Sequence, residues 1–167
     1  MPKSWFMPQI KLLHPDEWRT LQTIRLSALR ESPRSFLSTY EREKDYGEER
    51  WRAEFDRGDW SIGIIRGTPA SLLGTTREPG MPSHECYLEY LWVSPEHRRL
   101  GVALKMVTTV IERLRTYGVR TAFLWVLDGN EIAMKLYKQV GFVSSNHREL
   151  LEAHPGRSEE RLQLNLG

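Results

Sequence analysis

Apolar residues along this 167-residue chain follow two spacings, which alternate over most of its length. Short apolar runs predict strands, whereas apolar positions three and four residues apart predict amphipathic helices. Strands are predicted at residues 9–13, 60–65, 70–76, 87–93, 121–127, 142–151 and 160–166. Helices are predicted to run from about 14 to 32, 45 to 58, 101 to 118 and 130 to 141. This mixed order disfavours a doubly wound sheet of repeated strand–helix–strand units.

Local signals refine several of these elements. Asp45 and Glu48 have the spacing of a capping box, which predicts that Asp45 caps the second helix. The run at 121–127 is almost continuously apolar, which predicts a strand buried on both faces. The apolar stripe of the last helix is predicted to contain Ile132, Ala133, Leu136, Tyr137 and Val140.

One stretch predicts an anion-binding site. The strand at 87–93 must end at Pro95, which has no N–H for a sheet ladder, and a helix begins near Gly101. The first turn of a helix has unpaired N–H groups and a partial positive charge, and small residues there let an anion approach. Arg98 and Arg99 add full positive charges beside this turn.

At these residues the chain resembles the GNAT superfamily of acyl-CoA-dependent N-acyltransferases. The diphosphate-binding signature of that superfamily is Arg/Gln-x-x-Gly-x-Gly/Ala, and it is matched here by Arg98, Arg99, Leu100, Gly101, Val102 and Ala103. A second signature, N-x-x-A-x-x-L-Y-x-x-x-G-F, is matched from Asn130 to Phe142. Many members have Gly where Arg99 stands, which matters only if the φ angle there must be positive.

The resemblance implies an α/β (α+β mixed) fold: a central, mixed, mostly antiparallel and splayed sheet of six to seven strands, with about four helices on its faces. It implies one domain over residues 1–167 and transfer of an acetyl group from acetyl-CoA to an amine. Backbone groups of Leu91, Trp92 and Val93 would bind the pantetheine arm of coenzyme A. Asn130 and Ala133 would also contact this cofactor.

Two of these cofactor contacts have equally simple structural readings. Trp92 is either a wall of the cofactor channel or a core residue, and the sequence favours neither. Lys138 could reach the phosphates of coenzyme A, although a solvated helix lysine is the simpler reading.

Two side chains are candidates for proton transfer. An alkyl ammonium is almost wholly protonated at neutral pH, so a base must accept a proton before the amine can attack. Glu89 lies in an otherwise apolar strand and matches the glutamate of a pattern in diamine acetyltransferases of the superfamily; its alternative is a salt-bridged carboxylate without a role. Tyr137 matches the tyrosine that protonates the leaving thiolate, and its alternative is a core tyrosine.

Composition excludes other classes of function. The net charge is +2 and 24 basic residues are balanced by 22 acidic ones, which gives no support for a nucleic-acid binder. The single cysteine, Cys86, excludes an internal disulfide and makes a poor candidate nucleophile, and the scattered histidines predict no metal site. No apolar run is long enough to span a bilayer, and no secretory signal is visible, so we expect a cytoplasmic monomer or homodimer without membrane contact.

The acceptor stays open at this point. Small amines, amino-sugar antibiotics and protein amino groups are all compatible with the sequence, and a non-catalytic CoA-binding regulatory or scaffold protein is the alternative from another class. By the resemblance, the acceptor pocket would draw on Phe36, Tyr40, Tyr46, Trp51 and the loop at 153–158.

Overall fold

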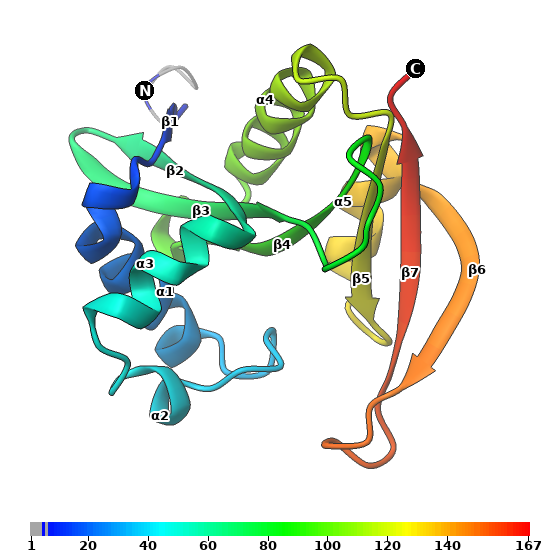
Figure 1. The fold of residues 1–167 in the computed structure, drawn as a ribbon, viewed down its shortest axis with the longest axis horizontal. Coiled ribbons are helices and arrows are strands. Elements are labelled where there is room, and N and C mark those ends of the chain that lie inside the picture. Colours follow the sequence, from blue (N-terminus) through cyan, green and yellow to red (C-terminus); the bar gives the residue numbers. More distant parts are fainter. Residues whose placement is uncertain (1–4, 6) are drawn as a thin grey trace.

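A single mixed sheet forms the centre of the molecule in the computed structural model, which describes residue 5 and residues 7–167 (Figure 1). Its strands are β1 (Gln9–Leu12), β2 (Gly58–Ile65), β3 (Thr68–Thr76), β4 (Glu85–Val93), β5 (Thr121–Leu127), β6 (Val143–Leu150) and β7 (Ser158–Asn165). The seven strands lie in the order β1-β2-β3-β4-β5-β7-β6. Neighbours are antiparallel except β4 and β5, which are parallel. The predicted fold class is confirmed.

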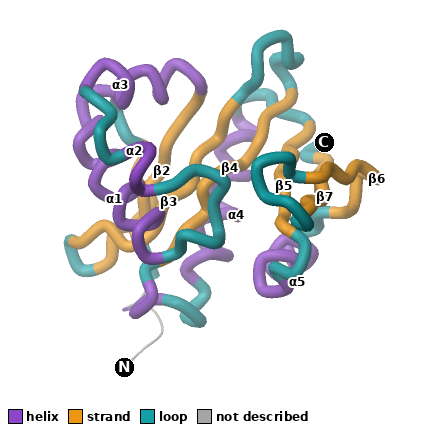
Figure 2. Tube along the Cα trace, turned by 90° about the horizontal axis from the view of Figure 1, so that it is seen from below, coloured by secondary structure: helices purple, strands orange, loops and turns teal. Residues whose placement is uncertain are grey.

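Helices cover the two faces of this sheet unequally (Figure 2). They are α1 (Trp18–Glu31), α2 (Tyr40–Glu43), α3 (Glu48–Arg57), α4 (Val102–Thr116) and α5 (Glu131–Val140). Trp60, Leu72 and Trp92 from the sheet pack with α1 and α3 in one core cluster. Leu73, Leu88 and other sheet residues pack with α4 and α5 in a second cluster on the opposite face. Burial of these two apolar faces stabilises the sheet between two helical layers.

Two local predictions about the helices are wrong, and one short helix was missed. Gly47, not Asp45, is the N-cap of α3, and no side chain caps this helix. The helix α2 was not predicted, because four residues are too few to show a helical period. Ile132 is 82% exposed, although it was placed in the apolar stripe of α5.

Strand β5 is fully buried on one face and partly buried on the other. Ala122, Leu124 and Val126 are buried against α4 and α5. On the other face, Phe123 is buried but Trp125 is half-buried. The prediction of two buried faces is therefore confirmed only in part, because α1, α2 and α3 cover the half of the sheet that contains β2, β3 and β4, and not β5 (Figure 1).

The sheet opens beyond the middle of β4. Residues 85–87 of β4 pair with residues 121–123 of β5, and these three pairs are the whole parallel ladder. The rest of β4, from Leu88 to Val93, keeps its antiparallel partner β3 on its other edge. The two strands then separate, so that one edge of β4 has no strand beside it (Figure 1).

Within the described chain, no helix has both the length and the apolar character needed to cross a membrane. The expectations of a cytoplasmic location and of a single domain over 1–167 stay predictions.

Candidate active site

An irregularity in β4 turns two consecutive side chains toward the same face of the sheet. Tyr90 has a φ of 59°, and the register of β3 with β4 shifts beside it. Tyr90 packs into the cluster of α1 and α3, and its neighbour Glu89 reaches an arginine of α3. A positive φ in a residue with a side chain is strained, and such strain is typical of functional sites.

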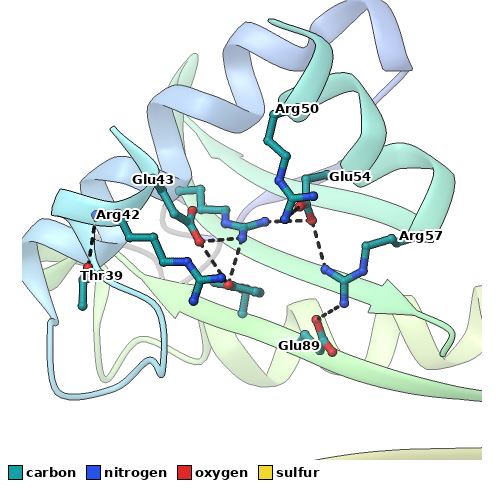
Figure 3. Close-up of polar contacts among 9 residues, drawn as sticks. Thr39, Arg42, Glu43, Arg50, Glu54, Arg57 and Glu89 are labelled. Atoms are coloured by element: carbon teal, nitrogen blue, oxygen red, sulfur yellow. Dashed lines mark hydrogen bonds and ion pairs between the residues drawn. The ribbon is translucent and has the colours of Figure 1, made fainter. Parts of the chain in front are cut away.

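Glu89 is half-buried and its carboxylate lies beside a cation (Figure 3). Its Oε2 atom is 3.6 Å from Nη2 of Arg57 in α3, and 31% of the Glu89 side chain is exposed. A carboxylate in this position is within reach of solvent and of a ligand, so it can accept a proton directly or through water.

Tyr137 lies in α5 on the other face of the sheet. Its ring packs against Phe142 with centroids 5.7 Å apart, and it belongs to the cluster that contains α4. Burial raises the pKa of its phenol above the ordinary value. The residue is 8% exposed, and no hydrogen bond of its hydroxyl is found among the described residues.

The two candidates lie on opposite faces of the sheet, which is open between β4 and β5. Glu89 is on the face covered by α1, α2 and α3, whereas Tyr137 is on the face covered by α4 and α5. The closed part of the sheet separates the two faces, and that separation ends where the parallel ladder ends at Tyr87 and Phe123. A ligand seated in the opening could therefore meet both side chains.

The turn after β4 has the backbone of an anion site. Gly101 is the N-cap of α4 with a φ of 83°, and no side chain caps that helix. Arg99 also has a positive φ, 62°, which is the condition under which its replacement of Gly carries strain. Left-handed residues next to a helix start direct backbone N–H groups toward a shared point, which favours binding of a phosphate.

Arg98 and Arg99 differ in what they contact. The Arg98 guanidinium donates to the carbonyl oxygen of Val93 at 2.9 Å and to the Glu31 carboxylate at 2.6 Å. Arg99 is exposed, and within the part of the chain that the structure describes its guanidinium has no partner. Arg99 is thus the freer of the two cations for a ligand phosphate.

The remaining predicted cofactor residues lie along β4 and the two helices after it. Leu91 and Val93 belong to the α4 face, and Trp92 is 8% exposed on the α1 face, where its indole N–H donates to Glu31 at 2.9 Å. The side chain of Trp92 therefore has a core position. The side chain of Asn130 caps α5 by accepting a hydrogen bond from the backbone N–H of Ala133. Of the others, Val102 is buried, Lys138 is exposed, and three are half-buried: Leu100, Ala103 and Ala133.

Only part of the expected acceptor pocket lies beside Glu89. The ring of Phe36 stacks on that of Tyr90 at 5.5 Å. Arg157, from the loop between β6 and β7, donates to the carbonyl of Arg34 at 3.2 Å and so joins this loop to the one after α1. Trp51 is completely buried, and so cannot line a surface pocket.

Four residues of the site have a role that the sequence did not predict: Arg25, Glu43, Glu54 and Arg57. A signal was present, because Arg25 is four residues after Leu21 and three before Ala28, on the buried face of α1. Glu54 is likewise three residues after Trp51. Charged residues on an apolar stripe predict buried partners, but the sequence alone does not say which.

Acetyl-CoA fits the residues at this opening. One edge of β4 is free for an extended amide-bearing arm, the start of α4 is uncapped, and the hydroxyl of Tyr137 is unpartnered among the described residues. No cluster of His, Cys, Asp or Glu that could hold a metal ion occurs within the described residues.

Solved structures share this fold. An acetyltransferase of the GNAT family from Streptococcus pneumoniae superposes with a TM-score of 0.80 at 16% identity, over 95% of this chain and 99% of the other. The structure of yncA from Salmonella typhimurium with its cofactor acetyl-CoA gives a TM-score of 0.77 at 12% identity, over 96% and 94% of the two chains.

Comparison of the sequence also identifies a relative of known activity and a family. A [ribosomal protein bS18]-alanine N-acetyltransferase of Haemophilus ducreyi is 37% identical over 76 residues, which are 46% of this chain and 52% of that protein. The match thus spans about half the length of that relative. Residues 18–142 match the model of the Acetyltransferase (GNAT) family, and this chain therefore belongs to that family.

Proposed function

We propose that the protein transfers an acetyl group from acetyl-CoA directly to the nitrogen of a primary amine. The observation that carries this proposal is the separation of β4 from β5 after three residue pairs, with Glu89 on one face of the sheet and Tyr137 on the other. Membership of an acetyltransferase family agrees with it.

In this proposal the chain's own residues orient the reactants and move two protons. Bound acetyl-CoA would supply the thioester whose acetyl group is transferred. Glu89 takes one proton from the ammonium, directly or through water, and thereby frees the lone pair that forms the new C–N bond. Tyr137 gives its proton to the sulfur as the C–S bond breaks. The nitrogen gives up its second proton to solvent as the amide forms. Solvent then takes the proton from Glu89 and reprotonates Tyr137, and the products are an acetylated amine and free coenzyme A.

The cofactor is held by groups that bind its two ends. Backbone atoms of residues 91–93 pair with the pantetheine amides in the manner of an added strand. The start of α4 and the free Arg99 bind the phosphates, and Lys138 lies one residue beyond Tyr137 on the exposed side of α5.

The first acceptor to test is a protein amino terminus, because the Haemophilus ducreyi relative is named for a ribosomal protein alanine. A small diamine and an amino-sugar antibiotic complete a panel of chemically distinct amines. Released coenzyme A can be measured with a thiol reagent, since Cys86 is buried and burial raises the pKa of its own thiol to about 11.

The test uses Glu89→Gln and Tyr137→Phe on the best acceptor of that panel. Loss of a general acid or base lowers kcat about 10²-fold or more, and we expect this for each variant with acetyl-CoA affinity retained. Glu112→Gln and Tyr117→Phe, which change exposed residues of α4 and its C-cap, are matched controls. Values of kcat/KM within a few-fold of the wild type in both site variants would refute the mechanism. Binding of acetyl-CoA without turnover of any amine would instead favour a CoA-binding scaffold.

A further inference from the structure

A buried cluster of charges lies on the helix side of Arg57, the partner of Glu89 (Figure 3). Arg25 of α1 is 3% exposed and contacts two carboxylates that are each 1% exposed, Glu43 of α2 and Glu54 of α3. Its Nη2 atom is 2.7 Å from Glu43 and its Nη1 atom is 3.1 Å from Glu54. Burial alone would lower the pKa of Arg25, but hydrogen bonding to Glu43 and both carboxylate charges raise it, so the guanidinium stays charged. These contacts fix the three helices to one another.

The same cluster holds the irregular part of β4. Nη2 of Arg25 donates to the hydroxyl of Tyr90 at 2.9 Å, and the guanidinium lies 4.0 Å from the centre of the Tyr90 ring. The ring of Trp60 lies on another side of the guanidinium, at 5.3 Å. Tyr90 has the strained positive φ and directly follows Glu89. The backbone that carries Glu89 is therefore tied to a buried group.

Arg57 makes the second connection, from the cluster to the Glu89 side chain. Its Nη1 atom is 3.2 Å from Oε2 of Glu54, and its Nη2 atom is 3.6 Å from Oε2 of Glu89. Glu54 is buried and held by Arg25, so one side of the Arg57 guanidinium has a fixed anchor. A planar guanidinium with fixed donor geometry can hold two carboxylates in a set relation, which a single ammonium cannot do.

We propose that Arg57 is a positioning residue that holds the carboxylate of Glu89 toward the opening between β4 and β5, with buried Glu54 as its anchor. This inference rests on the proposed role of Glu89 as the base. Arg57 itself touches no reacting atom in this proposal, so its loss changes where Glu89 points rather than which groups transfer protons.

The surface ion pair itself is a poor candidate for a stabilising role. The side chains of Arg57 and Glu89 are 44% and 31% exposed, and exposed ion pairs contribute little to folding. The ion pair can still affect the catalytic rate, because a displacement of about 1 Å in a reacting group can cost about 10²-fold in rate. The two roles are therefore separable by experiment.

Arg50 provides a matched control. It lies in the same helix α3, is 53% exposed, and contacts the same Glu54 at 3.7 Å. It has no contact with Glu89, whereas Arg57 has one. Arg50→Met and Arg57→Met remove the same type of side chain from the same anchor. They differ in the link of Arg57 to Glu89 and in the position of the Arg50 guanidinium, 5.2 Å from the centre of the Tyr46 ring.

The experiment measures kcat and KM for Arg57→Met, Arg57→Lys, Arg50→Met, Glu89→Gln and the double variant Arg57→Met/Glu89→Gln. We expect Arg57→Met to lower kcat by about 10- to 100-fold with KM for acetyl-CoA within about twofold. Arg57→Lys recovers part of the loss, and Arg50→Met is close to the wild type. In the Glu89→Gln background, Arg57→Met has no further effect on kcat, since its target is gone.

A measurement besides activity separates failure of the positioning role of Arg57 from failure of the catalytic role of Glu89. The ¹³C carboxyl resonance of Glu89 should shift in Arg57→Met and not in Arg50→Met. If Glu89→Gln lowers kcat while Arg57→Met acts like Arg50→Met, or if Arg57→Met acts equally with and without Glu89, the positioning role is wrong and the proposed function stands. If Arg57→Met moves the Glu89 resonance but Glu89→Gln leaves kcat unchanged, Glu89 is not the base, and the proposed function and the positioning role both fail.

Discussion

In the turn after β4, the arginine that matches the family motif is not the one that is free to bind a ligand. Arg98 matches the first position of the signature, yet its guanidinium contacts Val93, Glu31 and Ser32 of the same chain. Arg99 stands where many family members have Gly. Of these two arginines, it is Arg99 whose guanidinium has no partner among the described residues.

We therefore expect Arg99→Met to raise the Kd for acetyl-CoA by about tenfold to 100-fold, because a charged hydrogen bond contributes about 1.5–3 kcal/mol. The salt dependence of binding should weaken at the same time. Arg98→Met should mainly lower Tm, since its contacts join β4 to α1. Calorimetric titration and thermal unfolding measure the two effects, and a larger change of Kd in Arg98→Met would reverse the assignment.

The buried phenol of Tyr137 predicts a specific response to alkali. Burial raises its pKa, so the folded state disfavours the phenolate. Stability from this effect is fully present below the ordinary pKa near 10 and is lost as the pH rises above it. The free energy of unfolding should thus fall less steeply above about pH 10 in Tyr137→Phe than in the wild type. Parallel curves from denaturant titrations at several pH values would contradict this.

At the scale of elements, the irregularity of β4 depends on its partner strand. Gly74 of β3 is paired with Glu89, and a Cβ atom there would lie 2.6 Å from the buried ring of Trp60. Overpacking of this kind costs about 1–3 kcal/mol, so Gly74→Ala should lower the free energy of unfolding by that amount and also reduce kcat through Glu89. Gly47→Ala, where a Cβ meets no atom within 4 Å, is the control. Equal losses in the two variants would contradict the packing argument.

Hydrophobic periodicity predicted most elements correctly, because one buried face is enough to specify a strand or helix. It could not predict that α1, α2 and α3 leave β5 uncovered, since coverage is a property of the tertiary arrangement. The motifs predicted Gly101 as the start of α4 and Asn130 as the cap of α5, and both are confirmed. The Arg25 cluster was missed because its partners are brought together from α1, α2, α3 and β4 only by folding.

At the scale of the whole molecule, the opening predicts how the ligand should alter stability. A ligand that binds only the folded state at 100 times its Kd adds about 2.7 kcal/mol to the free energy of unfolding. Acetyl-CoA should therefore raise Tm, and it should slow hydrogen exchange most in residues 88–93 and 124–127, which face the opening. Uniform protection, or protection confined to β1 and β2, would place the ligand elsewhere.

The short parallel ladder between β4 and β5 also bears on the order of folding. Strands β2, β3 and β4 are neighbours in both sequence and sheet, so their pairing closes only short loops. Strand β5 joins them after a crossover through α4 with three residue pairs, and β7 must then enter between β5 and β6. On a ribosome, the meander and the helices before it would emerge first and could fold while β5 is still being synthesised. The half of the site that carries Glu89 would then be assembled before the half that carries Tyr137.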